Sequence, residues 1–179
     1  MKKTLLIPLL ILLLVGCTDD SSSTYSHKYR VRFYMETVQS TELYNAIGNP
    51  GQFVSIRPLN GKVKIENTLG GHEYSLSQLG SKEFEYGLGG LIVGTSSTPN
   101  MQGQFDIVAY DLACPNCHRQ NRRLTLNDNG TAHCANCGIN YDMNNYGWIL
   151  NVDNTKADGL RGLYRYRINY NGLAINVTN

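Results

Sequence analysis

Hydrophobic and polar residues alternate over short distances from Arg30 onward, and this period of two is typical of strands with one buried face. In the segment RVRFYMETV, residues 30–38, the pattern would place Val31, Phe33 and Met35 together on the buried face. Further strands are predicted at 52–58, 62–67, 89–96, 105–111 and within 163–177. The pattern therefore predicts one β-rich domain over residues 30–179.

Turn residues and one helical segment complete this picture. TELYNAI, residues 41–47, is the best helix candidate, and Gly48 and Pro50 would end it. Asn60-Gly61 predicts a hairpin between 52–58 and 62–67, and Asn171-Gly172 predicts a type I′ turn within 163–177. There is no long segment with a period of 3.6 and no internal repeat. The predicted fold class is all-β, an antiparallel β-sandwich or small barrel.

The first residues, MKKTLLIPLLILLLVGC, change the expected cellular location. Lys2 and Lys3 form a basic start, and the apolar run that follows is too short to span a bilayer as a mature helix. LVGC resembles the lipobox of bacterial lipoproteins, in which the leader is cut before a cysteine that becomes lipidated. We predict a signal peptide over 1–16 and a lipid anchor on Cys17. An ordinary signal peptide is the alternative.

Residues 17–29 are polar and rich in serine, which predicts a flexible tether behind the lipidated cysteine. Its start, TDDS, resembles the acidic export signal of surface lipoproteins in Bacteroidetes-type bacteria. The expected location is the cell envelope, at the outer membrane and exposed at the surface. Loss of Lys2 and Lys3 with the leader leaves 14 basic residues against 14 acidic ones. A balanced charge gives no reason to expect a nucleic-acid partner.

Four of the five cysteines form two C-x-x-C pairs separated by sixteen residues: Cys114, Cys117, Cys134 and Cys137. This spacing is typical of a four-thiolate zinc site. The residues between the pairs predict a strand, a turn at 127–130 and a return strand, which would bring the pairs together. His118 and His133 lie beside these cysteines but are not needed as ligands.

Other uses of the four cysteines remain open at this point. They could hold iron, or they could form two disulfides, the usual state of cysteines in exported proteins. A redox-active dithiol is less consistent with the pattern, because HRQNRRLTL after the first pair predicts a strand instead of the helix that lowers a thiol pKa. A closed four-sulfur shell leaves no position for water, which favours a structural metal over a catalytic one.

Two longer segments resemble a known family. FDIVAYDLACPNC and CANCGINYDMNNYG are similar to the two cluster-binding loops of Rieske proteins. The matching positions are Asp111, Cys114, Cys134, Cys137, Gly138, Tyr141, Asp142 and Gly147. The flanking segments also resemble the strands of the Rieske base domain, and the leader with GQFVSI resembles Rieske-like lipoproteins of Bacteroidetes. The resemblance implies an antiparallel Rieske-like β-domain with an inserted rubredoxin-like or zinc-ribbon subdomain at about 111–148.

The ligands depart from the Rieske pattern in a way that changes the expected chemistry. A Rieske cluster has two cysteines on one iron and two histidines on the other. Here Cys137 stands where the resemblance would place a histidine, and the first motif is Cys-x-x-Cys in place of Cys-x-His. The same subdomain with four cysteines could hold one Zn²⁺, one iron ion or an all-cysteine two-iron cluster.

We therefore expect a lipid-anchored envelope protein with a structural metal, preferably zinc, and a non-enzymatic role in binding or assembly. The sequence has no G-x-S-x-G or H-E-x-x-H motif. The alternative is an electron carrier with a [2Fe-2S] or rubredoxin-type iron centre at the same cysteines. The partner, a protein or a glycan, is not identified by the sequence. The twelve tyrosines of this chain fit either strand packing or an aromatic binding platform.

Overall fold

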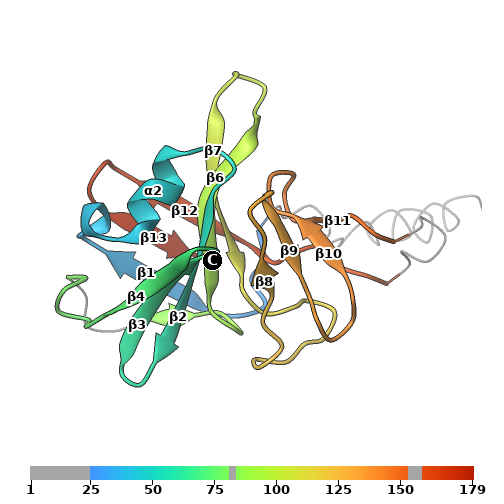
Figure 1. The fold of residues 1–179 in the computed structure, drawn as a ribbon, viewed down its shortest axis with the longest axis horizontal. Coiled ribbons are helices and arrows are strands. Elements are labelled where there is room, and N and C mark those ends of the chain that lie inside the picture. Colours follow the sequence, from blue (N-terminus) through green and yellow to red (C-terminus); the bar gives the residue numbers. More distant parts are fainter. Residues whose placement is uncertain (1–24, 81–83, 153–158) are drawn as a thin grey trace, which may run out of the picture.

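The computed structural model describes residues 25–80, 84–152 and 159–179, and Figure 1 shows their arrangement. Cys17, the signal peptide and most of the tether lie outside the described residues. The helical elements are η3 (Val38–Ser40) and α2 (Glu42–Gly48). The strands are β1 (Val31–Met35), β2 (Phe53–Leu59), β3 (Lys62–Asn67), β4 (Gly70–Tyr74), β5 (Glu85–Tyr86), β6 (Leu91–Pro99), β7 (Phe105–Asp111), β8 (Thr125–Leu126), β9 (Thr131–His133), β10 (Asn140–Asp142), β11 (Trp148–Ile149), β12 (Arg165–Tyr170) and β13 (Ile175–Thr178).

The strands form two antiparallel sheets, as the all-β prediction requires. The large sheet has nine strands in the order β4-β3-β2-β6-β7-β12-β13-β1-β5, and the small sheet has four in the order β11-β10-β9-β8. In Figure 1 the small sheet lies beside the large one, and the β6–β7 hairpin projects beyond both. The predicted helix is confirmed within one residue as α2, which follows Thr41 and contacts β6 and β2.

The two predicted hairpin turns differ in outcome. Asn60 and Gly61 both have positive φ, 51° and 76°, and they connect β2 to β3 as predicted. The second predicted hairpin is present, because β12 pairs with β13 and residues 171–174 connect them. Its predicted type I′ turn is wrong, because Gly172 has a positive φ of 95° and Asn171 does not. The physical reason is an Asx turn, in which the Asn171 side-chain oxygen accepts the N–H groups of Leu173 and Ala174.

A first hydrophobic core lies on one face of the large sheet and is covered by α2. Both ends of the sheet contribute to this single cluster, so the sheet must curl around it. Its fully buried members include Phe33 and Met35 of β1, Ile56 of β2, Ile65 of β3 and Leu43 of α2. The face predicted for 30–38 is therefore confirmed as the buried one.

A second hydrophobic core lies between the opposite face of the large sheet and the small sheet. On β6, Leu91 and Val93 face the first core, whereas Ile92 faces the second. On β7, Ala109 faces the first core, whereas Val108 and Tyr110 face the second. These central strands are buried on both faces, and this explains why their sequences are apolar runs instead of alternating patterns. The second core also contains the buried Cys114 and Cys134.

The small sheet is inserted between two neighbouring strands of the large sheet. The chain leaves β7 at Asp111 and returns to β12, which pairs with β7 through Arg165–Tyr110 and Tyr166–Ala109. The N–H of Asp111 donates to the carbonyl of Tyr164 at 2.9 Å, so the two ends of the insert meet. Among the described residues, no helix is long and apolar enough to cross a membrane.

Candidate metal centre

The four sulfur atoms of Cys114, Cys117, Cys134 and Cys137 converge at one end of the small sheet. All four lie within 4.8 Å of one another. The closest pairs join the two motifs, with Cys114 and Cys137 sulfurs 3.6 Å apart and Cys117 and Cys134 sulfurs 3.7 Å apart. The structure thus places the four predicted ligands together in a group that could hold a metal ion.

Two similar backbone turns aim the sulfurs inward. In the first, the N–H groups of Cys117 and His118 both donate to the carbonyl of Cys114 at 3.2 Å. In the second, the N–H of Gly138 donates to the carbonyl of Cys134 at 2.8 Å. Gly138 has a φ of 73°, a left-handed conformation that glycine adopts without a steric penalty. His118 takes the equivalent position after Cys117 with a φ of 50°.

A hairpin connects the two turns, as the sequence predicts. Strands β8 and β9 pair through Thr125–His133 and Leu126–Ala132, and the chain reverses at residues 127–130. The N–H of Cys114 donates to the carbonyl of Arg122 just before this hairpin, at 2.9 Å. The main chain therefore fixes the separation of the two cysteine pairs.

The sulfur spacing fits a single tetrahedral ion. Metal–sulfur bonds of about 2.3 Å place the corners of a tetrahedron about 3.8 Å apart, close to the two shortest sulfur–sulfur distances, and all four sulfurs lie within 4.8 Å of one another. A disulfide needs sulfur atoms only about 2.05 Å apart, and the four described cysteines are free thiols. The four thiols thus form a group that could hold one metal ion.

The close grouping of the thiols shifts their pKa values in different directions. Burial raises the pKa of Cys134, but the N–H groups of Cys137 and Asn136 and the neighbouring thiols outweigh burial and lower this pKa to about 7. Burial raises the pKa of Cys114 and, together with the neighbouring thiols, that of Cys137. Four thiolates so close together repel one another, and a divalent ion removes this repulsion because thiolates are its ligands.

Side chains beyond the cysteines donate hydrogen bonds to the sulfurs. The Tyr141 hydroxyl lies 3.3 Å from the sulfur of Cys114 and accepts a hydrogen bond from the Asn116 amide at 2.9 Å. The Asn136 amide donates to the sulfur of Cys117 at 3.3 Å. These partners orient the ligands and delocalise their charge.

Sequence reasoning did not identify the roles of the two asparagines, although a signal was present. The motifs CPNC and CANC carry asparagine at the same position, directly before the second cysteine. Asn116 also exchanges two hydrogen bonds with the main chain of Arg161, 45 residues later. That contact ties the first turn to the end of the insert, and local sequence gives no sign of it.

Asp111 holds the base of the insert in place. Its buried carboxylate accepts hydrogen bonds from the N–H groups of Leu88 (2.6 Å), Gly89 (3.0 Å) and Ala113 (2.7 Å), and from the Tyr166 hydroxyl (2.7 Å). Burial raises the pKa of Asp111, although these four bonds act in the opposite direction. The sequence marked Asp111 only through its resemblance to a family motif.

The two histidines beside the cysteines have other partners. The ring of His118 is exposed, and its Nδ1 lies 3.3 Å from the Tyr164 hydroxyl. His133 Nδ1 lies 2.7 Å from the side-chain oxygen of Asn140. Among the described residues, the group of close ligand atoms at this site consists of the four cysteines.

Comparisons of the chain with protein-family models, with curated proteins and with solved structures find no match. The chemistry of the site therefore follows from its own residues: four thiols at tetrahedral spacing, two of them buried, with hydroxyl and amide donors around them. The chain is an all-β protein whose four-cysteine group could hold a metal ion.

Proposed function

We propose that this chain is a lipid-anchored protein of the bacterial cell envelope that binds one structural Zn²⁺ and serves binding or assembly instead of catalysis. The observation that carries the metal assignment is the convergence of four cysteine sulfurs at the spacing of one tetrahedral ion. Four thiolates complete the zinc shell, and a complete shell leaves no position at which water or substrate could be activated.

The position of the ligands supports a structural role. Cys114 and Cys134 belong to the second hydrophobic core together with Tyr141 and Leu124. The small sheet has only short strands, so its own hydrogen bonds give it limited stability. A metal bound at the two turns would link both ends of the β8–β9 hairpin to this core and hold it closed.

The Rieske-like assignment of the domain is part of the proposal. Its support is the match of Asp111 and Cys114 to one family motif and of Cys134 to Gly147 to the other. An insert that carries two metal-binding turns and interrupts an antiparallel β-domain agrees with that resemblance. In this assignment Cys137 replaces a histidine ligand, so the fold is retained while the two-histidine iron site is lost.

Envelope location rests on the leader and on Cys17, which lie outside the described residues. Metabolic labelling with a radiolabelled fatty acid tests the anchor directly. The full chain should incorporate the label, whereas the Cys17→Ser variant should not. Equal labelling of both forms, or an unlabelled full chain, would overturn the lipid anchor.

The second candidate function is an electron carrier with iron at the same cysteines. Two observations favour it: Cys137 is exposed, which would bring an iron centre close to a redox partner, and Tyr141 and Asn136 donate to sulfurs. Hydrogen bonds to sulfur and solvent exposure both set the potential of such centres. A two-iron cluster requires ligands on two separate metals, and this fits the tight grouping of the sulfurs less well than one ion does.

Metal analysis with a visible spectrum distinguishes these functions. The protein would be expressed from Thr18 and purified without reductant or added metal. One zinc per chain and no colour support the proposal, and Cys134→Ser should then lose the zinc, whereas His133→Asn should keep it. Iron with charge-transfer absorption would establish the electron carrier instead. Absence of metal together with absence of free thiols would overturn both functions.

A further inference from the structure

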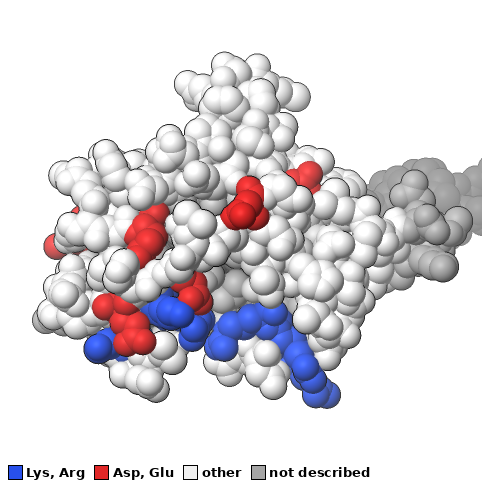
Figure 2. All heavy atoms as spheres, viewed as in Figure 1, with Lys and Arg blue, Asp and Glu red and all other residues white. Residues whose placement is uncertain are grey.

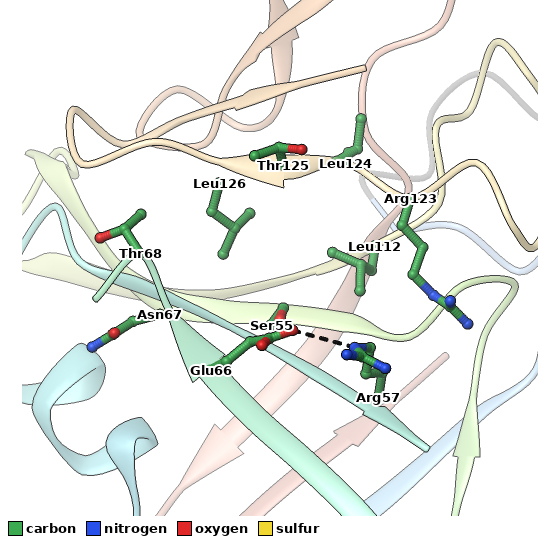
Figure 3. Close-up of a pocket in the computed structure, with 10 residues that line it drawn as sticks. All are labelled: Ser55, Arg57, Glu66, Asn67, Thr68, Leu112, Arg123, Leu124, Thr125 and Leu126. Carbon is green, nitrogen blue, oxygen red and sulfur yellow. Dashed lines mark hydrogen bonds and ion pairs between the residues drawn. The ribbon is translucent and has the colours of Figure 1, made fainter. Parts of the chain in front are cut away.

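A cleft of about 350 Å³ lies between the large sheet and the small sheet. Strands β2 and β3 form one wall, and the segment from Leu112 through β8 forms the other. Figure 3 shows the side chains that line it; those used below are Arg57, Glu66, Leu112, Arg123, Leu124 and Leu126. The volume is at the lower end of the range for small-molecule sites.

One end of the cleft is basic. Arg57 and Arg123 come from opposite walls and lie at the same end in Figure 3. On the face shown in Figure 2, Lys and Arg side chains gather on both sides of a hollow along the lower edge. Glu66 is the acidic residue among those that line the cleft, so the lining carries a net charge of +1. That charge complements a single anion.

Each guanidinium is held in position through its Nε atom. Arg57 Nε donates to the Glu66 carboxylate at 3.2 Å, and Arg57 is only 21% exposed. Arg123 Nε donates to the carbonyl of Gly89 at 2.7 Å, and the N–H of Gly89 is in turn held by Asp111. Both hydrogen bonds leave the Nη atoms available for an oxyanion, and side chains that are already ordered lose little entropy when a ligand binds.

Three leucines give the cleft an apolar part, and Ser55, Asn67, Thr68 and Thr125 also line it. Leu112 and Leu124 are buried in the second core, and Leu126 is half-buried beside them. In Figure 3 the Leu126 side chain points into the space between the two walls. A ligand that fits the basic end and also contacts the leucines needs an oxyanion joined to an apolar group.

We propose that this cleft binds a small organic carboxylate. The carboxylate lies between Arg57 and Arg123, and the apolar body contacts the half-buried Leu126, because Leu112 is only 2% exposed. Glu66 disfavours a dianion such as phosphate, because its own charge lies in the same cleft. The inference goes beyond the proposed function by giving the binding role a ligand class, and it does not depend on which metal the cysteines hold.

An NMR titration of the metal-loaded chain from Thr18 tests the proposal with octanoate as the probe. Octylamine has the same apolar chain with the opposite charge, and inorganic phosphate has the charge without the chain. We expect saturable shifts of the backbone amides of Ser55, Arg123 and Thr125 with octanoate, and much weaker ones with the other two. Failure of octanoate to saturate these shifts, or tighter binding of octylamine or phosphate, would overturn the proposal.

Variants assign the binding to the two arginines. Arg123→Gln should weaken octanoate binding by about 10-fold or more, the effect of losing a hydrogen bond between charged groups. Arg57→Gln, on the other wall, should do the same. The matched control is Arg122→Gln, an exposed neighbour that does not line the cleft and should bind as the wild type does. Equal binding by Arg122→Gln and both cleft variants would refute the assignment.

Metal content measured on the same samples keeps the two proposals separate. Loss of zinc with an intact octanoate response would count against the metal proposal alone. Retained zinc without an octanoate response would count against the cleft alone.

Discussion

Replacing Asp111 with asparagine tests whether this buried carboxylate holds the insert to the large sheet. In Asp111→Asn the amide oxygen can keep the bonds from Gly89 and Ala113, which share one carboxylate oxygen. The amide nitrogen then faces the N–H of Leu88 and the Tyr166 hydroxyl. A hydroxyl can turn and accept, but a backbone N–H cannot, so one donor loses its partner.

The expected loss of stability follows from these bonds. An unpaired and partly buried N–H costs about 1–3 kcal/mol, and three bonds change from charged to neutral acceptors, which removes about 1 kcal/mol each. Relief from burying a carboxylate without a cation offsets part of this, since burial raises the pKa of Asp111. We expect Asp111→Asn to lower the free energy of unfolding by about 2–4 kcal/mol.

Urea unfolding of the metal-loaded protein measures this loss. With a slope of about 2 kcal/mol per molar urea, the midpoint should fall by about 1–2 M. Asp106→Asn on the same strand is the control, because that carboxylate accepts one side-chain bond from Asn100 and should change stability by less than about 1 kcal/mol. If Tyr166→Phe is equally destabilising in the wild type and in the Asp111→Asn background, or if Asp111→Asn matches the control, the reasoning is refuted.

Three further outcomes are expected. Gly138→Ala should destabilise the metal-loaded protein by about 1–2 kcal/mol, because its left-handed backbone is strained for alanine even though the added Cβ would meet nothing within 4 Å. The control is Gly48→Ala, where φ is not positive and no loss of stability is expected. Equal urea midpoints for the two variants would contradict this prediction. Removing the metal with a chelator should abolish the hydrogen-exchange protection of β8–β10 before that of β1 and β13, which belong to the first core. If all these strands lose protection together, the small sheet does not unfold separately from the first core. The raised pKa of Asp111 means that the folded protein keeps this proton to higher pH than the unfolded chain does, so its contribution to stability should fall as pH rises from the ordinary value of 3.8. The decline should appear as a shrinking difference in the free energy of unfolding between the wild type and Asp111→Asn across pH 4–7. Both proteins contain the same metal site, so its acid lability cancels in this difference.

Local signals account for the parts of the fold that were predictable. The hairpin at Asn60-Gly61 and the end of α2 both depend on residues whose backbone preferences are strong enough to act alone. The edge strand β4, with the sequence GGHEY, has no apolar alternation and is mostly exposed, so nothing in its own residues distinguishes it from a loop. The strand order is also non-local: β2 lies next to β6, and β12 lies between β7 and β13.

In the candidate site, too, local sequence predicted some features, and others depend on tertiary packing. Cysteine spacing was sufficient to predict four convergent ligands, because C-x-x-C turns impose their own geometry. The cleft between the sheets was not predictable, since Arg57 and Arg123 lie on segments that meet only through tertiary packing. The role of Asp111 also depends on residues far away in the chain, as Tyr166 shows.

The meeting of the insert's two ends has a consequence for how such a protein can evolve. Because the chain leaves β7 and re-enters the neighbouring strand β12, ligands and loops inside the insert can be exchanged without shifting the register of the large sheet. What cannot be exchanged freely is the apolar surface that the insert covers, because Ile92 and Tyr110 would otherwise meet water. Among descendants of such a chain, the identity of the metal ligands should therefore drift faster than the apolar cover beneath them.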